Sequence, residues 1–231
     1  MPTLLITGAN RGIGLELCKQ YLAEDWTIHA TCRQPESAQE LNKLCQASNG
    51  KLTVHPLDVT NPTQIKNLQQ VLKNTSIDIL LNNAGVHAQD ASQFGKSDEA
   101  TWDEAVHVNL LAPLKMMEHF VDHVGDSEQR LIVNMSSKMG SIADNGSGGA
   151  YAYRATKAAL NAVTVSAAQD LKYRKINVIV MHPGWVRTDM GGPNGEISVA
   201  ECATQLRAIF GKLTLKDSGK FLDIDGTEIP W

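Results

Sequence analysis

Residues 3–14 read TLLITGANRGIG, an apolar run followed at once by glycines at positions 8, 12 and 14. A short apolar run bounded by glycine predicts a buried strand, and the helical spacing over 14–24 predicts a helix directly after it. The missing side chains let backbone N–H groups approach a pyrophosphate, for which the helix N-terminus supplies partial positive charge. The spacing is G-x-x-x-G-x-G rather than G-x-G-x-x-G, so taken alone it leaves a plain tight turn open as the alternative.

The same alternation of strand and helix continues along the chain. Apolar runs lie at 27–32, 51–59, 77–85, 130–137, 175–184 and 220–224, and helical stretches at 14–24, 37–47, 62–74, 99–123, 150–172 and 198–210. Strands that are apolar on both faces and alternate with helices predict a parallel sheet covered by helices on each side. No linker or repeat is visible, so we predict an α/β fold with one doubly wound domain over 1–231.

Composition excludes several classes of function. The net charge of −4 provides no basic field for nucleic acid, and no apolar run approaches the roughly 20 residues of a membrane span. The start of the chain does not resemble a signal peptide. The cysteines lack metal or disulfide spacing and are expected as free thiols in a reducing cytoplasm, and the histidines show no HExxH pattern. We therefore expect a cytoplasmic protein that binds no metal, membrane or nucleic acid.

In a doubly wound fold, ligands bind beyond the carboxyl ends of the strands. The second strand ends at Arg33, and no acid is present there to bind the ribose 2′-OH of NAD. Arg33 and Arg11, which lies inside the glycine turn, could bind the 2′-phosphate of NADP through forked hydrogen bonds. The pattern favours NADP over NAD, with two solvated surface arginines as the alternative.

The next two strand ends carry residues with two possible roles each. Asp58 could accept a hydrogen bond from an adenine amino group, or could form a helix cap with Thr60 or Asn61. In NNAG (82–85), a ribose could pass beside the amides and the glycine, but Asn82 or Asn83 could instead tie neighbouring strands together. The residues alone leave both pairs of alternatives open.

A tyrosine and a lysine stand one helical turn apart in GGAYAYRATKAALN (148–161). Residues i and i+4 are neighbours on a helix, which pairs Tyr153 with Lys157, whereas Tyr151 has only Ala155 at that position. Ser136 and Ser137 follow the fifth strand. After the sixth strand, Pro183-Gly184 turns the chain in HPGWVRTDM, and Thr188 could bond a carboxamide.

Together these motifs resemble the short-chain dehydrogenase/reductase family. The matching stretches, in the family's order, are TGANRGIG, NNAG, VHVNLLAP, VNMSS, YRATK and PGWVRTD. HPGWVRTDMGG and the ending FLDIDGTEIPW are most similar to the C-factor and sniffer-type carbonyl reductase branch. The resemblance implies a seven-stranded Rossmann sheet and a homo-oligomer, either dimer or tetramer.

The resemblance also implies a catalytic tetrad of Asn109, Ser137, Tyr153 and Lys157. The interval from Ser137 to Tyr153 is longer than is usual in the family, and the extra residues fall in SIADNGSGGA (141–150). Ser136 and Ser141 therefore remain alternatives to Ser137.

The implied reaction is hydride transfer from NADPH to the carbonyl of a small aldehyde, ketone or quinone. Tyr153 would donate the proton, Ser137 would bond the developing alkoxide, and Lys157 would lower the pKa of Tyr153. Asn109 would mark a helix kink that holds a proton-relaying water. The alternative is a C-factor-like signalling or regulatory protein that binds NAD(P) as a sensing or structural ligand.

With the resemblance, the candidate cofactor-binding residues are Gly8, Asn10, Arg11, Gly12, Ile13, Gly14, Arg33, Asp58, Val59, Asn83, Ala84, Gly85, Tyr153, Lys157, Pro183, Gly184, Val186 and Thr188. The segment 189–198 is short and glycine-rich, which predicts a small lid and an open site for a carbonyl substrate. Trp185 and Met190 could form its apolar walls or could serve only in packing.

Overall fold

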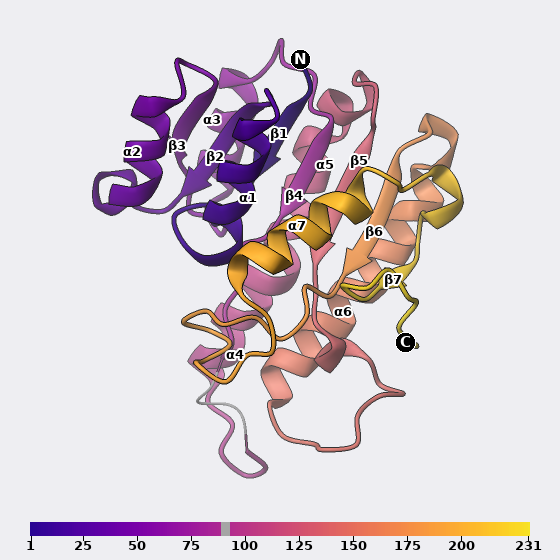
Figure 1. Cartoon of the computed structure of the whole chain (residues 1–231). Helices are drawn as coiled ribbons and strands as arrows, with labels where there is room; N and C mark the ends of the chain where they lie inside the picture. Colours follow the sequence, from indigo (N-terminus) through magenta and orange to yellow (C-terminus); the bar gives the residue numbers. More distant parts are fainter. Residues whose placement is uncertain (89–92) are drawn as a thin grey trace.

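The structure is a computed structural model that describes residues 1–88 and 93–231. One sheet holds the strands β1 (Thr3–Ile6), β2 (Thr27–Cys32), β3 (Leu52–Pro56), β4 (Ile79–Asn82), β5 (Leu131–Met135), β6 (Asn177–Met181) and β7 (Phe221–Leu222). Their order is β3-β2-β1-β4-β5-β6-β7, and every neighbouring pair is parallel. The predicted seven-stranded, doubly wound sheet is confirmed (Figure 1).

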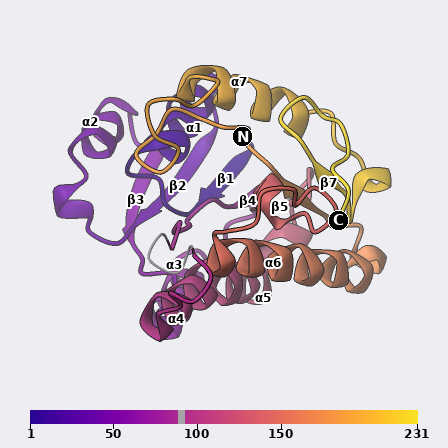
Figure 2. The same cartoon turned by 90° about the horizontal axis from the view of Figure 1, so that it is seen from below.

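Helices cover both faces of this sheet (Figures 1 and 2). The α-helices are α1 (Gly12–Ala23), α2 (Gln39–Ala47), α3 (Pro62–Val71), α4 (Glu99–Val106), α5 (Ala112–Gly125), α6 (Tyr151–Asp170) and α7 (Val199–Phe210). Short 3₁₀ helices lie at Pro35–Ser37, Lys138–Gly140, Lys172–Arg174 and Leu215–Asp217. None of the helices in the described part of the chain is long and apolar enough to cross a membrane.

The two faces of the sheet have separate apolar cores. Leu4 and Ile6 of β1 face the core that includes α1, α2 and α7, whereas Leu5 faces the core that includes α3 and α5. Figure 2 shows these two groups of helices on opposite sides of the strands. This alternation explains why the strands read as continuous apolar runs, because both faces of each strand are buried.

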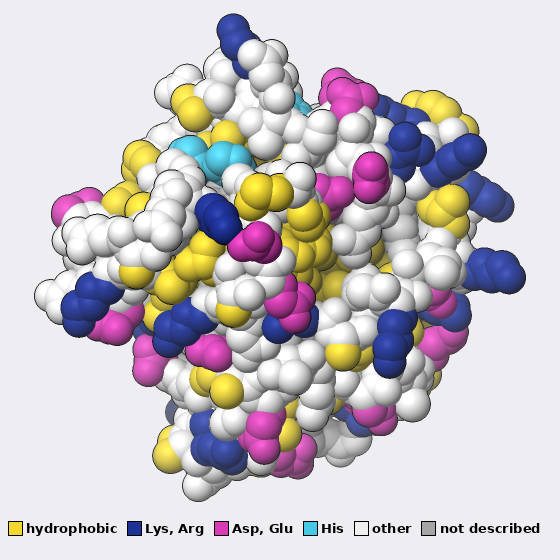
Figure 3. All heavy atoms as spheres, turned by 45° about the horizontal axis from the view of Figure 1, so that its top comes forward, with side chains coloured by type: hydrophobic (Ala, Val, Ile, Leu, Met, Phe, Trp, Pro, Cys, Tyr) yellow, Lys and Arg dark blue, Asp and Glu magenta, His cyan; other side chains and the backbone are white. Residues whose placement is uncertain are grey.

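Charged side chains are spread over the outside of the molecule. On the face seen in Figure 3, acidic and basic side chains are interspersed over most of the surface, and several Lys and Arg side chains gather at its right-hand side.

The helix predicted over 99–123 is interrupted. α4 and α5 are joined by a π-helical segment, His107–Leu111, in which the N–H of Ala112 donates to the carbonyl of His107 five residues earlier. Pro113 contributes to this change, because it has no N–H to donate to the carbonyl of Asn109 in an α-helix. Asn109 lies inside the π-helical segment and is fully buried.

A buried polar chain ties the centre of the sheet to α6. The Asn82 Nδ2 atom of β4 donates to Asn134 Oδ1 of β5 over 2.8 Å, and Asn134 Nδ2 donates to Thr164 Oγ1 of α6 over 2.9 Å. Asn82 thus has the structural role that the sequence left open. These hydrogen bonds fix how α6 lies against the sheet, and α6 carries Tyr153 and Lys157.

Replacing Asn134 with leucine should lower the free energy of unfolding by about 1–3 kcal/mol, because it leaves the buried Asn82 amide with only a 3.5 Å contact to the Pro113 carbonyl. Urea unfolding measures the loss. The matched control is Ser166→Ala, whose hydroxyl lies on the exposed side of α6 and whose effect should stay within about 0.5 kcal/mol. A loss no larger than that of the control would contradict the role of Asn134.

Candidate active site

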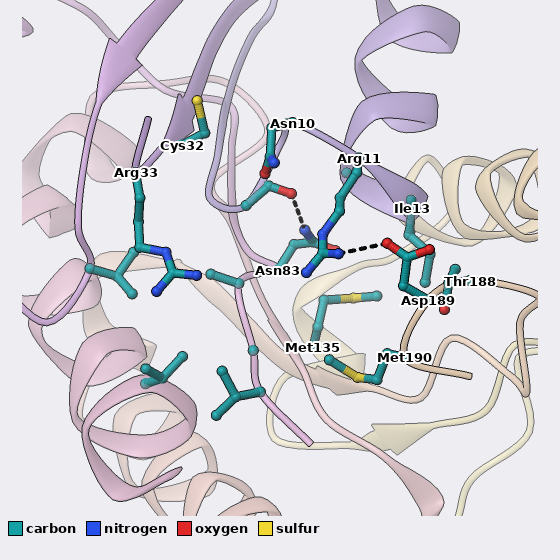
Figure 4. Close-up of a pocket in the computed structure, with 18 of the residues that line it drawn as sticks. Asn10, Arg11, Ile13, Cys32, Arg33, Asn83, Met135, Thr188, Asp189 and Met190 are labelled. Atoms are coloured by element: carbon teal, nitrogen blue, oxygen red, sulfur yellow. Dashed lines mark hydrogen bonds and ion pairs between the residues drawn. The ribbon is translucent and has the colours of Figure 1, made fainter. Parts of the chain in front are cut away.

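A cavity of about 850 Å³ opens at the carboxyl ends of the strands. Of the residues predicted from the sequence, those that line it are Gly8, Asn10, Arg11, Gly12, Ile13, Gly14, Arg33, Asp58, Val59, Asn83, Ala84, Gly85, Ser136, Tyr153, Lys157, Pro183, Thr188 and Met190, whereas Ser137 lies just outside this set. The structure therefore brings the glycine turn, the end of β2 and the Tyr153/Lys157 pair to one continuous space. Figure 4 shows part of this cavity.

The glycine turn lies directly against the end of β4. A Cβ atom on Gly14 would stand 2.4 Å from the carbonyl oxygen of Gly8 and 2.7 Å from Asn83 Nδ2, so only glycine fits there. Asn83 Nδ2 donates to the carbonyls of Thr7 (2.9 Å) and Gly8 (3.1 Å). The Asn83 side chain thus ties the turn to β4, which is the structural alternative of the two roles considered.

The start of α1 is open toward the cavity. Arg11 is its N-cap residue, and among the side chains that the structure describes none caps the first turn. The free N–H groups and the lack of side chains at the turn form a cradle suited to an anionic phosphate.

Both predicted arginines line the cavity, but they differ in their partners. Arg11 Nη1 lies 2.6 Å from Asp189 Oδ2 in the loop after β6, so its guanidinium points to that loop (Figure 4). Arg33 forms no ion pair with any other described residue. Asp189 was not predicted from the sequence, because no local pattern links it to Arg11, which is far away along the chain.

Asp58 lines the cavity and also shapes its own loop. Its Oδ1 accepts hydrogen bonds from the N–H (2.9 Å) and the hydroxyl (2.7 Å) of Thr60. The cap of α3 is Asn61, whose Oδ1 accepts from the N–H groups of Thr63 and Gln64. Asp58 is therefore held by Thr60 at the cavity wall and is not itself the cap.

Tyr153 and Lys157 lie together in the buried first half of α6, with 8% and 4% of their surface exposed. Lys157 Nζ donates to the carbonyl of Met135 at the end of β5 over 2.8 Å and lies 5.7 Å from the centre of the Tyr153 ring. Burial lowers the pKa of Lys157 to about 8. Burial raises the pKa of Tyr153, and the nearby Ser137 hydroxyl acts in the opposite direction.

The expected lowering of the Tyr153 pKa by Lys157 is therefore not found in the free chain. Loss of water around the phenol has the larger effect, because removal from water disfavours the charged phenolate.

The three candidate serines have different partners. The Ser136 hydroxyl donates to Asn161 Oδ1 over 2.6 Å, and the Ser141 hydroxyl donates to the carbonyl of Pro230 over 2.5 Å. Ser137 Oγ accepts from the N–H of Met139 over 3.2 Å, which leaves its proton free to donate. Ser137 is also the serine that acts on the pKa of Tyr153.

Asn109 does not line the cavity but fixes one of its walls. Its Oδ1 accepts from the N–H of Val86, and its Nδ2 donates to the carbonyl of Val86, both over 2.9 Å. A Cβ atom on Gly85 would stand 3.3 Å from Asn109 Oδ1 and 3.6 Å from Lys157 Nζ. Asn109 therefore holds the chain after β4 directly beside Lys157.

Several hydrogen bonds hold the short, glycine-rich loop after β6. Thr188 lines the cavity, and its Oγ1 accepts from the N–H of Gly191 over 3.0 Å. Gly184 and Val186 do not line the cavity; Gly184 packs against Ile197 and Ile224, and Val186 is buried. Met190 lines the cavity, whereas the Trp185 indole donates to the Gly191 carbonyl within the loop.

One residue beside the pair was missed. The His87 ring packs against the Tyr153 ring with centroids 4.9 Å apart, and its buried Nδ1 has no hydrogen-bond partner among the described residues. Its place two residues after NNAG is the sequence signal that could have indicated it. Asp103, Glu104 and His107 of the α4 region also line the cavity. His107 lies within VHVNLLAP, from which only Asn109 was predicted.

Known proteins match the chain in both sequence and structure. It is 37% identical over 155 residues to the C-signal of Myxococcus xanthus, covering 67% of this chain and 93% of that protein. The carbonyl reductase Sniffer of D. melanogaster superposes with a TM-score of 0.94 at 33% identity, covering 100% of both chains. The NADPH-bound carbonyl reductase from chicken fatty liver superposes with a TM-score of 0.92 at 34% identity, covering 100% of this chain and 99% of that one.

The model of the short chain dehydrogenase family matches residues 2–197. The predicted dimer or tetramer and the predicted cytoplasmic location stay predictions. The cavity, the Tyr153/Lys157 pair and these similarities lead to one conclusion: the chain belongs to the short chain dehydrogenase family.

Proposed function

We propose that this protein is an NADPH-dependent reductase of small aldehydes, ketones or quinones, with Tyr153 as the proton donor. The observation that carries the proposal is the single cavity that joins the glycine turn and Arg33 to Tyr153 and Lys157. The similarity to two carbonyl reductases, one of them with bound NADPH, supports it.

The residues of the cavity fit a dinucleotide. Gly8 and Gly14 lie in close contact and have no side chains, so a phosphate can approach the backbone of the turn. The open N-terminus of α1 favours the negative charge of a pyrophosphate. Arg33 supplies a cation without an acidic partner among the described residues for a 2′-phosphate. Lys157 and Thr188 line the same space and would hold the nicotinamide ribose and carboxamide.

When bound, NADPH supplies the hydride that the carbonyl carbon accepts. Tyr153 donates its phenolic proton to the carbonyl oxygen, and Ser137 donates a hydrogen bond to the same oxygen as negative charge develops there. The charged ammonium of Lys157 then stabilises the phenolate that remains. Because burial raises the pKa of Tyr153, the phenol carries its proton at neutral pH, which suits a proton donor.

The test is the loss of NADPH and NADH absorbance with a panel of aldehydes, ketones and quinones. Turnover with a preference for NADPH is expected, and Tyr153→Phe should remove most of that turnover while NADPH binding survives. The phenylalanine variant keeps the ring but has no proton to donate. Tyr151→Phe, on the exposed entry of α6, is the matched control and should retain turnover.

Near-normal turnover of Tyr153→Phe would contradict the assignment. If neither cofactor is oxidised with any carbonyl, the second candidate is favoured. This is a signalling or regulatory protein that binds NAD(P) as a sensing or structural ligand, and it has support from the similarity to the C-signal.

The serine variants distinguish Ser137 from its neighbour. Ser137→Ala removes the donor to the developing alkoxide and should lower kcat by roughly 10²–10³-fold. Ser136 also lines the cavity, but its hydroxyl proton is donated to Asn161, so Ser136→Ala should change stability more than kcat. Steady-state kinetics of both variants and urea unfolding provide the comparison, and a larger kcat loss in Ser136→Ala would reverse the assignment.

The protonation of Lys157 should be visible in the stability of the free protein. Burial lowers its pKa in the folded chain to about 8, whereas the unfolded chain keeps the ordinary value of 10.5. Between these values the unfolded chain binds the extra proton, so the free energy of unfolding rises with pH. Relative to Lys157→Met, wild type should gain roughly 2 kcal/mol between pH 7 and pH 9.5.

Urea unfolding of both proteins without cofactor across that pH range measures this difference. Lys66→Met, on the exposed side of α3, is the control and should follow wild type. Parallel pH profiles of wild type and Lys157→Met would contradict a buried lysine of low pKa.

A further inference from the structure

An ion pair joins two residues that line opposite segments of the cavity wall, the glycine turn and the loop after β6. It joins Arg11 of the glycine turn to Asp189 of the loop after β6, with 2.6 Å between Nη1 and Oδ2. Both residues line the cavity, and Figure 4 shows the Arg11 guanidinium directed at Asp189. The pair thus links the part of the cavity suited to phosphate with the loop that brings Thr188 and Met190 to the cavity.

The two partners are held to different degrees. The loop around Asp189 is fixed by the hydrogen bond from Gly191 to Thr188 Oγ1 and by those from Arg187 Nη1 to the carbonyls of Gly195 (2.9 Å) and Glu196 (3.0 Å). The Arg11 side chain is 69% exposed and, among the described residues, has Asp189 as its sole ion-pair partner. The Arg11 side chain can therefore turn away from Asp189 without any movement of this loop.

The pair is weak enough to be exchanged. The Asp189 side chain is 77% exposed, and ion pairs between exposed side chains contribute little because water and salt screen them. A 2′-phosphate carries nearly two charges and accepts forked hydrogen bonds from a guanidinium, so it competes well for Arg11. Arg33, on the same cavity wall, offers the other guanidinium.

We propose that Asp189 is a positioning residue for cofactor selectivity that competes with the 2′-phosphate of NADPH for Arg11. In the free chain, Asp189 holds the guanidinium at the loop after β6. When the phosphate binds, Arg11 turns to it and leaves Asp189. The inference rests on the proposed function, since it requires that NADPH binds in this cavity.

Asp189→Asn keeps the size of the side chain and removes its charge. It should tighten NADPH binding by roughly two- to fivefold, because Arg11 no longer has a competing acid, and it should leave NADH binding unchanged. Isothermal titration calorimetry of both cofactors measures the two dissociation constants directly. The matched control is Asp25→Asn, which removes the same charge from an exposed pair with Lys51 outside the cavity lining and should change neither constant.

An Arg11→Ala background separates competition from a general charge effect. In that background Asp189→Asn should leave the dissociation constant of NADPH unchanged, because the guanidinium for which Asp189 and the 2′-phosphate compete is gone. The inference is overturned if Asp189→Asn leaves the NADPH constant unchanged. It is also overturned if the variant weakens NADPH and NADH equally, which would show the pair acting as a clasp over the cofactor. Wild-type protein that does not bind NADPH would instead overturn the proposed function.

Discussion

The turn between β1 and α1 and the end of β4 approach each other so closely that there is no room for a side chain between them. Gly14 meets the Gly8 carbonyl and the Asn83 amide at distances that exclude a Cβ atom. The Asn83 side-chain amide donates hydrogen bonds to the backbone carbonyls of the glycine turn. The contact sets the direction of α1 and keeps its first N–H groups open toward the cavity. It also fixes the start of the segment after β4, in which Gly85 lies beside Lys157.

The buried half of α6 follows a different constraint, the cost of placing charge away from water. Tyr153 and Lys157 respond to burial in opposite directions, and each shift favours the neutral side chain. The pair therefore differs from a preformed phenolate–ammonium pair. The Lys157 ammonium is charged at neutral pH, but the phenolate becomes favourable only when the reaction produces it beside that ammonium, and this is the condition under which binding energy lowers a barrier rather than stabilising the resting site.

The sequence predicts best what depends on neighbours along the chain. The strand and helix order, the glycine turn and the i, i+4 pair of Tyr153 and Lys157 are local patterns, and the structure contains all of them. What it does not reveal depends on distant partners. The two possible roles of Asn83 become distinguishable only once the turn lies beside β4, and the partner of Arg11 stands 178 positions away. The π-helical segment holds Asn109, whose two hydrogen bonds to Val86 are a contact that no periodicity encodes.

That π-helical segment has a consequence for the helix as a whole. A π-helical turn is an α-helical turn with one residue added, and each residue of an α-helix advances it by about 100°. The apolar stripe of α5 is thus rotated relative to that of α4. Ala105 packs against Ala152 of α6, while Phe120 packs beneath the sheet. The continuous helix from α4 to α5 can therefore face two different neighbours. An insertion or deletion between 106 and 112 would rotate one half relative to the other, so the number of residues there is constrained more strictly than their identity.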